Sequence, residues 1–554
     1  MSHKSARHDS GHVPVFLRAI SLTTLGVVSA GLIYFSSDLT NAVPQLGKPH
    51  TNTIQITERR DQVICPSGIK VDSADGIQTS DIGIDPGQTS TILNAWFKGQ
   101  GVSGNVFGFL NSGSETARLN LSNEGRSTIG PIDEPLGVQA HGEIEQLAAT
   151  TLTTATGSSA LGVSAVACQT PALEQWLVGG STTLGSSSEL VIQNPSQTPV
   201  TVKVELWGAN GKLTLAAQDT YLVPANQELS TLLEGLSAEQ RRLVVRVSAS
   251  GGMVTSYLKT INQSGLTPQG GSYVSAGIGL AEEHILPGVY VEEGEIGDST
   301  TGAIRLLSPE VSTSAHIAIF DAQGQYVLRG YQTVPLISGE VKDFSLGGLP
   351  KGFYTIVVTG DKPILAGAQA VRDGQVSADR FIGQPVDRAW IASTSGSVQA
   401  ATVTLPSGVW NTLSVGVFPG DVSGVNDGLG AVPIVYDNPD DMDADLVANW
   451  KGKPVADLVI FDVSGQETKR ETISLADFQS RVYELTNYAA GIEVAAVRLE
   501  PKSDYLVENN LVLAWSVSLS SQEVAHSLTT VQPVLNQDSS TDLTVRHSPK
   551  LGVG

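Results

Sequence analysis

Cysteine, histidine and charged residues are all scarce in this sequence. Its 554 residues include two cysteines and nine histidines, and only 16% of them are charged. A structural zinc site takes about four Cys or His ligands close together, so two distant cysteines argue against one. The 58 glycines and the many short runs of Val, Thr and Ser favour β-sheets over a bundle of helices.

Positive charge is also in short supply. Lys and Arg together number 33 against 55 Asp and Glu, which leaves a net charge of −22. Nucleic-acid binding depends on clustered Lys and Arg that displace phosphate counterions. The composition therefore argues against a nucleic-acid partner, and we interpret the negative charge as a solubilising surface.

Common catalytic motifs are missing as well. The chain contains no GxSxG, no HExxH and no Walker-type phosphate loop. The stretch "GQGVSG" (99–104) matches GxGxxG, but a strand-like run follows it where a dinucleotide site needs a helix. We interpret that stretch as a hairpin turn. The sequence thus predicts no catalytic residue, no cofactor and a protein that is not an enzyme.

The N-terminus, by contrast, carries a clear targeting pattern. Residues 1–18 hold three basic side chains against one acidic one, and residues 19–35 ("AISLTTLGVVSAGLIYF") hold no charge. A helix of that length spans roughly 26 Å, which suits a membrane-inserted segment. The basic flank predicts a single-pass protein of the cell membrane with a cytoplasmic N-terminus and an extracellular bulk. Small residues before Gly31 and Val43 leave cleavage by a signal peptidase as the alternative to a retained anchor.

Export places both cysteines in an oxidising compartment. An even number of cysteines in an exported chain usually means disulfides. We therefore predict a bond between Cys65 and Cys168. It would close a loop of about a hundred residues and contribute about 4 to 5 kcal/mol in the chain-entropy model.

One strand-and-turn phrase occurs three times, as "VELWGANGK", "IAIFDAQGQ" and "LVIFDVSGQ", with a turn glycine at 211, 324 and 465. Period-two alternation surrounds each copy, and the spacing of the copies fits domain-sized repeats. A degenerate first copy places Gly125 in the turn position. We therefore predict an all-β protein of tandem β-sandwich modules behind one transmembrane helix.

The predicted domain organisation follows from these patterns. Its segments are a cytoplasmic tail (1–18), a transmembrane signal anchor (19–35), a linker (36–60), β modules at 61–175, 176–283, 284–388 and 389–535, and a flexible C-terminal tail (536–554).

Two stretches of the sequence resemble known protein families, and these resemblances imply a location for the protein. The pattern "IAIFDAQGQYV … FSLGGLPKGFYTIVV" resembles the immunoglobulin-like sandwiches of many bacterial surface proteins. More specifically, a Cys followed by "WLVGGSTTLGSSSELVIQNPS" looks like a family of uncharacterised actinobacterial envelope proteins with one N-terminal membrane segment. This resemblance implies an envelope location and no chemistry, because that family has no established activity. The residues that carry it are Cys168, Trp176, Gly179, Gly180, Asn194 and Pro195.

An acidic run near residue 440 is the one metal candidate. Asp441, Asp443 and Asp445 alternate as the first three ligands of a calcium loop do, and Asp437 lies close by. Leu446 stands where that loop needs Gly, so we favour a solvated acidic loop and keep calcium as the alternative. Tryptophans lie mostly in apolar strand segments, so we expect core positions for Trp176, Trp207, Trp390, Trp450 and Trp515.

The sequence as a whole favours a membrane-anchored, exported scaffold or interaction protein of the bacterial cell envelope, without catalysis. Its expected partners are envelope proteins or cell-wall glycans. An array of carbohydrate or cell-wall binding modules is one alternative, and it would expose Trp and Tyr along one surface. An unrecognised envelope enzyme is the other, and it would need convergent polar residues in one pocket.

Overall fold

Strands account for almost all regular structure in the computed structural model, and the prediction of an all-β protein is confirmed. Its described residues include only two short helices, α2 (Leu233–Leu236) and α5 (Ser503–Glu508). The structure describes residues 51–56, 62–69, 88–109, 119–121, 124–156, 162–265, 267–298, 301–326, 333–374, 383–420, 452–485, 491–521, 527–533 and 541–546.

The chain divides into two units, residues 1–58 with 537–554, and residues 59–536. In the first unit, β1 (Thr51–Ile56) pairs antiparallel with β33 (Thr541–Arg546). The predicted linker and the predicted flexible tail therefore each contain a strand. Both segments contain several β-branched residues, which favour strands, but each is only six residues long.

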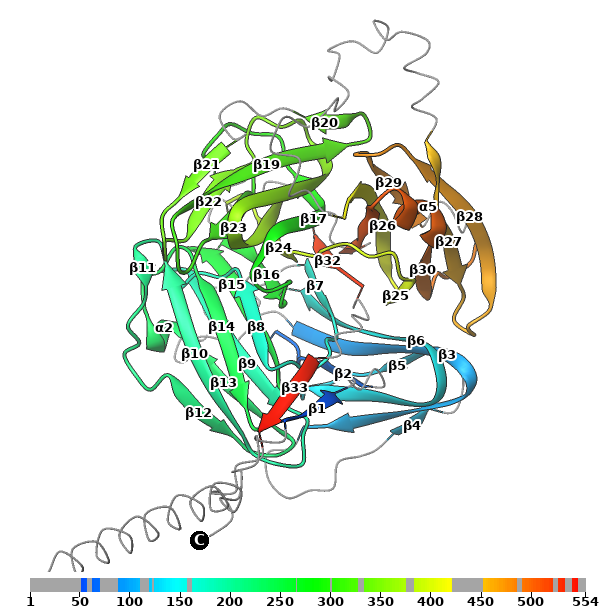
Figure 1. The fold of residues 1–554 in the computed structure, drawn as a ribbon, viewed down its shortest axis with the longest axis horizontal. Helices are drawn as coiled ribbons and strands as arrows, with labels where there is room; N and C mark the ends of the chain where they lie inside the picture. Colours follow the sequence, from blue (N-terminus) through cyan, green and yellow to red (C-terminus); the bar gives the residue numbers. More distant parts are fainter. Residues whose placement is uncertain are drawn as a thin grey trace, which may run out of the picture. The chain divides into compact units, whose positions relative to one another are not determined.

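The second unit contains four strand sets that follow one another along the chain, coloured from blue to red in Figure 1. The first set is β2 (Gln62–Cys65), β3 (Gln88–Gly108), β4 (Leu119–Leu121), β5 (Gly125–Ile129), β6 (Leu136–Thr156) and β7 (Gly162–Ala167). The second set is β8 (Glu174–Val178), β9 (Ser186–Asn194), β10 (Val200–Gly208), β11 (Gly211–Lys212), β12 (Thr220–Val223), β13 (Gln227–Leu232), β14 (Val244–Ser250), β15 (Thr255–Ser264) and β16 (Thr267–Val274).

The remaining two sets complete the unit. The third set is β17 (Ala281–Val291), β18 (Ala303–Leu307), β19 (Thr313–Asp321), β20 (Gly324–Tyr326), β21 (Thr333–Leu336), β22 (Lys342–Ser345), β23 (Gly352–Asp373) and β24 (Val386–Ala392). The fourth set is β25 (Ala401–Thr404), β26 (Val409–Pro419), β27 (Lys453–Phe461), β28 (Glu467–Leu475), β29 (Ser480–Glu484), β30 (Ala496–Pro501), β31 (Leu511–Ser521) and β32 (Thr529–Val531).

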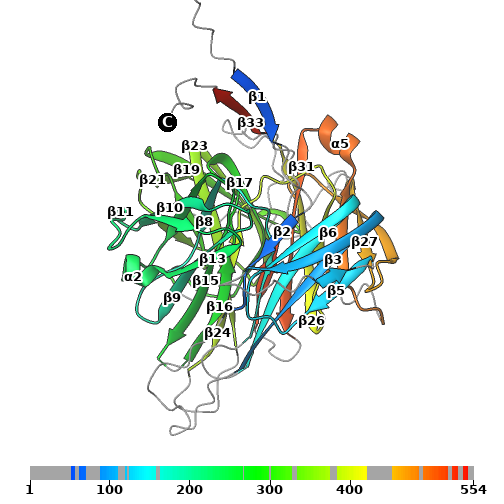
Figure 2. The same cartoon turned by 90° about the horizontal axis from the view of Figure 1, so that it is seen from below.

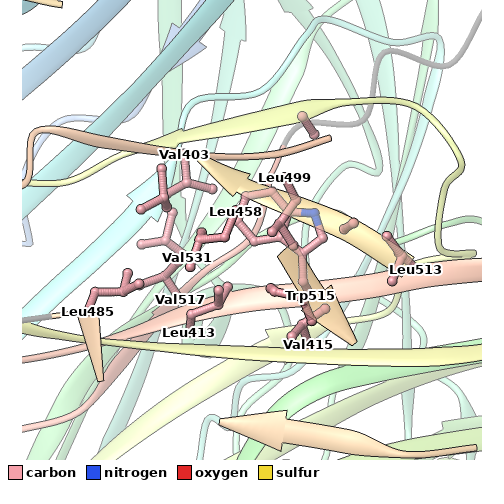
Figure 3. Packing of buried hydrophobic residues seen from close by; sticks show 14 of the residues in the cluster. Val403, Leu413, Val415, Leu458, Leu485, Leu499, Leu513, Trp515, Val517 and Val531 are labelled. Atoms are coloured by element: carbon pink, nitrogen blue, oxygen red, sulfur yellow. The ribbon is translucent and has the colours of Figure 1, made fainter. Parts of the chain in front are cut away.

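The second and fourth sets each consist of two sheets that share one core. In the second set the sheets run β11-β10-β14-β8 and β13-β9-β15-β16, and in the fourth β25-β30-β27-β28 and β29-β26-β31-β32. Figure 3 shows the fourth core, where Leu413, Trp515 and Val517 from one sheet meet Leu458 and Leu499 from the other. The alternating apolar residues of the sequence therefore face inward, as strand periodicity requires.

In the third set the long strand β23 joins two sheets, because its first half pairs with β17 and β19 and its second half pairs with β18 and β24. The first set differs from the expected two-sheet module, because it is hydrogen-bonded into a single sheet through very long strands. Figure 2 shows β3 and β6 running side by side for most of their length. The predicted hairpin turn at 99–104 is wrong: these residues lie inside β3, where its register with β6 shifts. Glycines there let β3 bend, and a Cβ at Gly104 would approach the Phe97 ring to 2.8 Å.

The predicted module boundaries do not coincide with gaps between the sets. The boundaries after residues 175, 283 and 388 fall within β8, β17 and β24 respectively. The turn glycines of the three repeated phrases do behave as predicted, because Gly211, Gly324 and Gly465 all have positive φ.

Small apolar clusters join neighbouring sets, and every set contributes to two of them. Val166 of the first set meets Tyr257 and Tyr273 of the second. Trp176 and Trp207 of the second set meet Leu307 and Leu365 of the third. Phe320 of the third set meets Phe418 of the fourth, and Phe461 of the fourth meets Trp96 of the first. The four sets therefore close into a ring.

No helix in the described part of the chain is both long and apolar enough to cross a membrane. The predicted anchor at 19–35 lies outside the described residues, and its prediction is unchanged.

The predicted bond between Cys65 and Cys168 is present, and both residues are fully buried. It lies beside a backbone bridge between Ile64 and Gln169, and the Tyr257 hydroxyl of the second set donates to the Ile64 carbonyl, 2.7 Å away. The disulfide therefore holds the segment on which the second set rests.

Replacing both cysteines with serine should lower the free energy of unfolding by about 2 to 5 kcal/mol, because the bond closes a loop with a sequence separation of 103. Urea unfolding measures the change, and wild-type protein held in reductant serves as the control, since it should behave like the variant. An unchanged midpoint in both would contradict the structural role of this bond. Thiol labelling of the denatured, unreduced wild type should detect no free cysteine.

Candidate functional site

One strand from each set reaches a common meeting point, which we call the central junction: β7, β16, β24 and β32. Figure 1 places these four labels together near the middle of the ribbon. Side chains rather than a continuous backbone ladder connect them. Ser164 donates to the Gly271 carbonyl at 2.6 Å, and the Trp390 N–H donates to the Ser272 hydroxyl at 3.2 Å.

The fourth set completes the junction with further hydrogen bonds. The Thr529 hydroxyl accepts from the Ala165 N–H at 2.9 Å and donates to the carbonyl of the same residue at 3.0 Å. Gln532 donates through its side-chain amide to the Ala392 carbonyl at 2.7 Å. Each strand of the junction is therefore tied to two others, and the ring closes on satisfied polar groups.

Asp387 of β24 is the residue at which all four sets meet. Its carboxylate accepts from the Leu528 N–H at 2.8 Å and from the Arg388 N–H at 2.9 Å. Glycines of the first and second sets lie directly against it. A Cβ would come within 2.9 Å of the carboxylate at Gly162 and within 2.4 Å at Gly270, and both glycines have positive φ. Close approach and backbone conformation therefore both require glycine at these two positions.

Burial dominates the electrostatics of this carboxyl group. Asp387 is 1% exposed, and its burial raises the pKa from an ordinary aspartate value to about 8. The two N–H donors and the guanidinium groups of Arg388 and Arg372 oppose that rise. The junction thus holds a carboxyl group that binds a proton over much of the neutral range.

A pKa raised on folding makes stability fall as pH rises. Between the ordinary pKa near 3.8 and the folded pKa of about 8, the folded chain binds one proton more at Asp387 than the unfolded chain does. The free energy of unfolding should therefore lose about 1.4 kcal/mol per pH unit from this group. Urea unfolding of the wild type and of Asp387→Asn from pH 4 to pH 8 measures how the difference between their free energies of unfolding changes with pH.

The asparagine variant has no proton to exchange, so its deficit relative to the wild type should be largest near pH 4 and should shrink as pH rises. The deficit itself arises because an amide oxygen replaces only one of the two acceptors. A gap that stays constant or widens as pH rises would contradict the raised pKa of Asp387.

A second polar cluster lies where the first two sets meet. The Lys259 ammonium donates to the Ser67 hydroxyl at 2.7 Å, and both residues are buried. Serine next to lysine is the pair that some hydrolases use. Here Glu189 also lies 3.6 Å from the Lys259 nitrogen, and Tyr273 donates to the Ser67 carbonyl. The Lys259 nitrogen thus has a hydroxyl and a carboxylate as partners, and its bond to Ser67 joins the first two sets.

The one buried histidine among the described residues is also engaged in the structure. The Nε2–H of His284 donates to the Ile364 carbonyl at 2.8 Å, while Nδ1 faces the Ser393 hydroxyl at 3.0 Å. Burial lowers the pKa of His284 to about 4. A neutral, fully hydrogen-bonded imidazole inside the third set holds strands together.

A double-mutant cycle tests the structural interpretation of the serine and lysine. Ser67→Ala and Lys259→Met should each destabilise the protein, with a coupling free energy of about 1 to 3 kcal/mol, because each leaves the other group without its partner. Chemical unfolding of the two single variants and the double variant measures this coupling. Additive effects would mean that the observed hydrogen bond does not contribute to stability.

The residues singled out in the sequence have mixed outcomes. Trp176, Trp207, Trp390 and Trp515 are buried as expected. Trp450 and the calcium candidates Asp437, Asp441, Asp443 and Asp445 lie outside the described residues. Groups of three or more metal-binding side chains are absent from the part of the chain that the structure describes.

Sequence reasoning missed the central junction and the Ser67–Lys259 pair. Asp387 stands in an ordinary stretch, "PVDRAW", and its glycine contacts are more than a hundred residues away in the chain. The position of Ser67 was a usable signal for a buried polar contact, because this serine lies two residues after the disulfide-bonded Cys65 in "CPSG".

Comparison with known proteins gives one family. A family model described as a family of unknown function, DUF5719, matches residues 128–453. The matched region starts in β5, covers the second and third sets and ends at the first residue of β27. It includes three of the four junction strands, and β32 lies beyond it. No curated protein matches the chain.

Proposed function

Because the chain belongs to the family of unknown function DUF5719, we propose its role from its geometry: a non-catalytic binding scaffold of the bacterial cell envelope. The single observation that supports this role is the closure of the four strand sets around the central junction. A body tied at every junction presents its surface loops in fixed relative positions, and such pre-organisation reduces the entropy lost on binding.

The polar groups best suited to chemistry favour the same role. Ser67, Lys259, His284 and Asp387 are all buried, and each makes hydrogen bonds that join strands or sets. A catalytic centre needs such groups near a substrate-accessible surface. Their use inside the protein supports binding over catalysis.

The envelope location forms part of the proposal. The basic and then apolar N-terminus supports a retained single-pass anchor with residues 43–554 outside the membrane. The disulfide supports export, because such bonds persist in oxidising compartments. We also propose that the strand sets derive from immunoglobulin-like modules of an actinobacterial envelope family, with envelope proteins or cell-wall glycans as partners.

Crosslinking of the full-length protein in intact cells tests the binding role. The wild type should capture a specific envelope partner, because its surfaces are held in place by the central junction. Gly270→Ala should lose most of this capture, since its Cβ collides with the Asp387 carboxylate. Gly235→Ala is the matched control, because a Cβ at Gly235 has no atom within 4 Å. Protease added to wall-stripped cells should digest the exported part in all three proteins.

Two results would count against the proposal. Survival of the large part under external protease would refute export. Turnover of a glycan, peptide or ester that Ser67→Ala abolishes without changing the unfolding midpoint would identify an enzyme instead of a scaffold.

A further inference from the structure

Trp410 is unlike the other described tryptophans. Its side chain is 44% exposed, near the start of β26. The remaining described tryptophans are buried in cores or in clusters between sets: Trp96, Trp176, Trp207, Trp390 and Trp515. An indole has a large apolar face and one polar N–H, and it stacks on ring surfaces. Trp410 is exposed on a strand that fixes its position, so its indole is a candidate surface for binding a ligand.

Oxygen-bearing side chains surround this indole on the same sheet face. Trp410 pairs with Ser520 of β31, and two residues further along the register runs straight across four strands. That row is Glu484, Thr412, Ser518 and Thr530. Ser518 is only 3% exposed, and its hydroxyl lies 3.4 Å from that of Thr530, so the accessible oxygens beside the indole belong to Ser520, Thr412 and Glu484. We call Trp410, Ser520, Thr412 and Glu484 the Trp410 strip.

The strip is continuous with the interface between the third and fourth sets. Further along the same sheet face, Ser516 donates to the Pro287 carbonyl at 2.9 Å, and Phe418 packs against Phe320. A Cβ at Gly288 would come within 2.2 Å of the Ser516 hydroxyl, so the third set lies directly on that part of the face. Ser516 and Ser518 are therefore both buried on this face, while Trp410 and Glu484 on the same face are exposed.

We propose that the Trp410 strip binds an uncharged saccharide chain. This inference deepens the proposed binding role and rests on it, because it names the ligand class of one surface. The indole supplies a stacking platform, and the Thr and Ser hydroxyls supply donors and acceptors for sugar hydroxyls. The only charged residue of the strip is Glu484, and the chain has a net charge of −22, so anionic polymers are repelled.

The composition of the strip argues against other occupants. A protein partner or a second copy would need several exposed apolar or aromatic anchors at the centre of the interface. The strip has one, and Val482, 40% exposed on the same face, adds a second beside it. A membrane surface with anionic lipids favours Lys and Arg near the indole, and the strip contains neither. Charge and hydroxyl content thus both select a neutral polyol.

Acrylamide quenching of tryptophan fluorescence tests the inference on the full-length protein. In a Trp450→Phe background, quenching should report mainly Trp410, because the other described tryptophans are buried. Soluble oligomers of glucose and of N-acetylglucosamine are the probes. At least one should protect the indole from acrylamide, and Trp410→Ala should weaken its binding about tenfold or more by calorimetry. Trp410→Phe should retain part of the affinity.

Leu184→Ala is the matched control, because Leu184 is 96% exposed and lies in the turn before β9 of the second set. It should bind like the wild type, and all variants should keep the wild-type unfolding midpoint. The inference is overturned if neither oligomer protects the indole, or if Trp410→Ala binds like the wild type. It is also overturned if the variant instead loses binding to phosphatidylglycerol vesicles or dissociates a dimer. Capture of an envelope partner that does not depend on Trp410 would leave the scaffold role intact in each case.

Discussion

Each strand set leaves apolar side chains on outer sheet faces that only a neighbouring set can cover, and the rest of the structure follows from this constraint. Trp176 and Trp207 on the second set, or Phe461 on the fourth, would be exposed in an isolated module. Covering such rings gains roughly 25 cal/mol for each Å² of apolar surface removed from water. Because every set has two such faces and two neighbours, the sets satisfy one another only when the ring closes.

Closure of the ring brings a cost at its centre. Four strand ends converge where there is little room, and glycine at 162 and 270 makes that approach feasible beside Asp387. A buried carboxyl group is worth less to stability than an apolar residue of the same size would be. Its two backbone donors come from the third and fourth sets, so Asp387 selects one relative position of these sets. We regard positional specificity as the reason for the polar residue, at the expense of stability that is lost as pH rises from about 4 to about 8.

Local features of the fold were predictable from sequence, and distant ones were not. Alternation and turn glycines predicted the strands, and export with two cysteines predicted the disulfide. The ring depends on contacts between residues that are far apart in the sequence. Arg126, for example, donates to the carbonyl of Leu405, which lies 279 residues further along the chain, and no local pattern encodes such a contact. Similarly, the glycines at 99–104 predict a hairpin turn, whereas the structure has a bend within one long strand. Glycine occurs in both, so the sequence alone does not distinguish them.

The repeated phrase acquires a second meaning once the ring is known. The Gly208 carbonyl beside the first turn accepts from the Val341 N–H of the third set, 3.0 Å away. The Ala322 carbonyl in the second turn accepts from the side chain of Gln479 in the fourth set. In the third turn, the Gly465 carbonyl accepts from Lys98 of the first set at 3.2 Å. Each copy therefore ends a core strand and also offers a backbone carbonyl to the next set around the ring. Every copy of the phrase offers the same group, a backbone carbonyl, as an acceptor for the neighbouring set. The donors that reach these carbonyls differ from copy to copy, so the donors determine which set follows which.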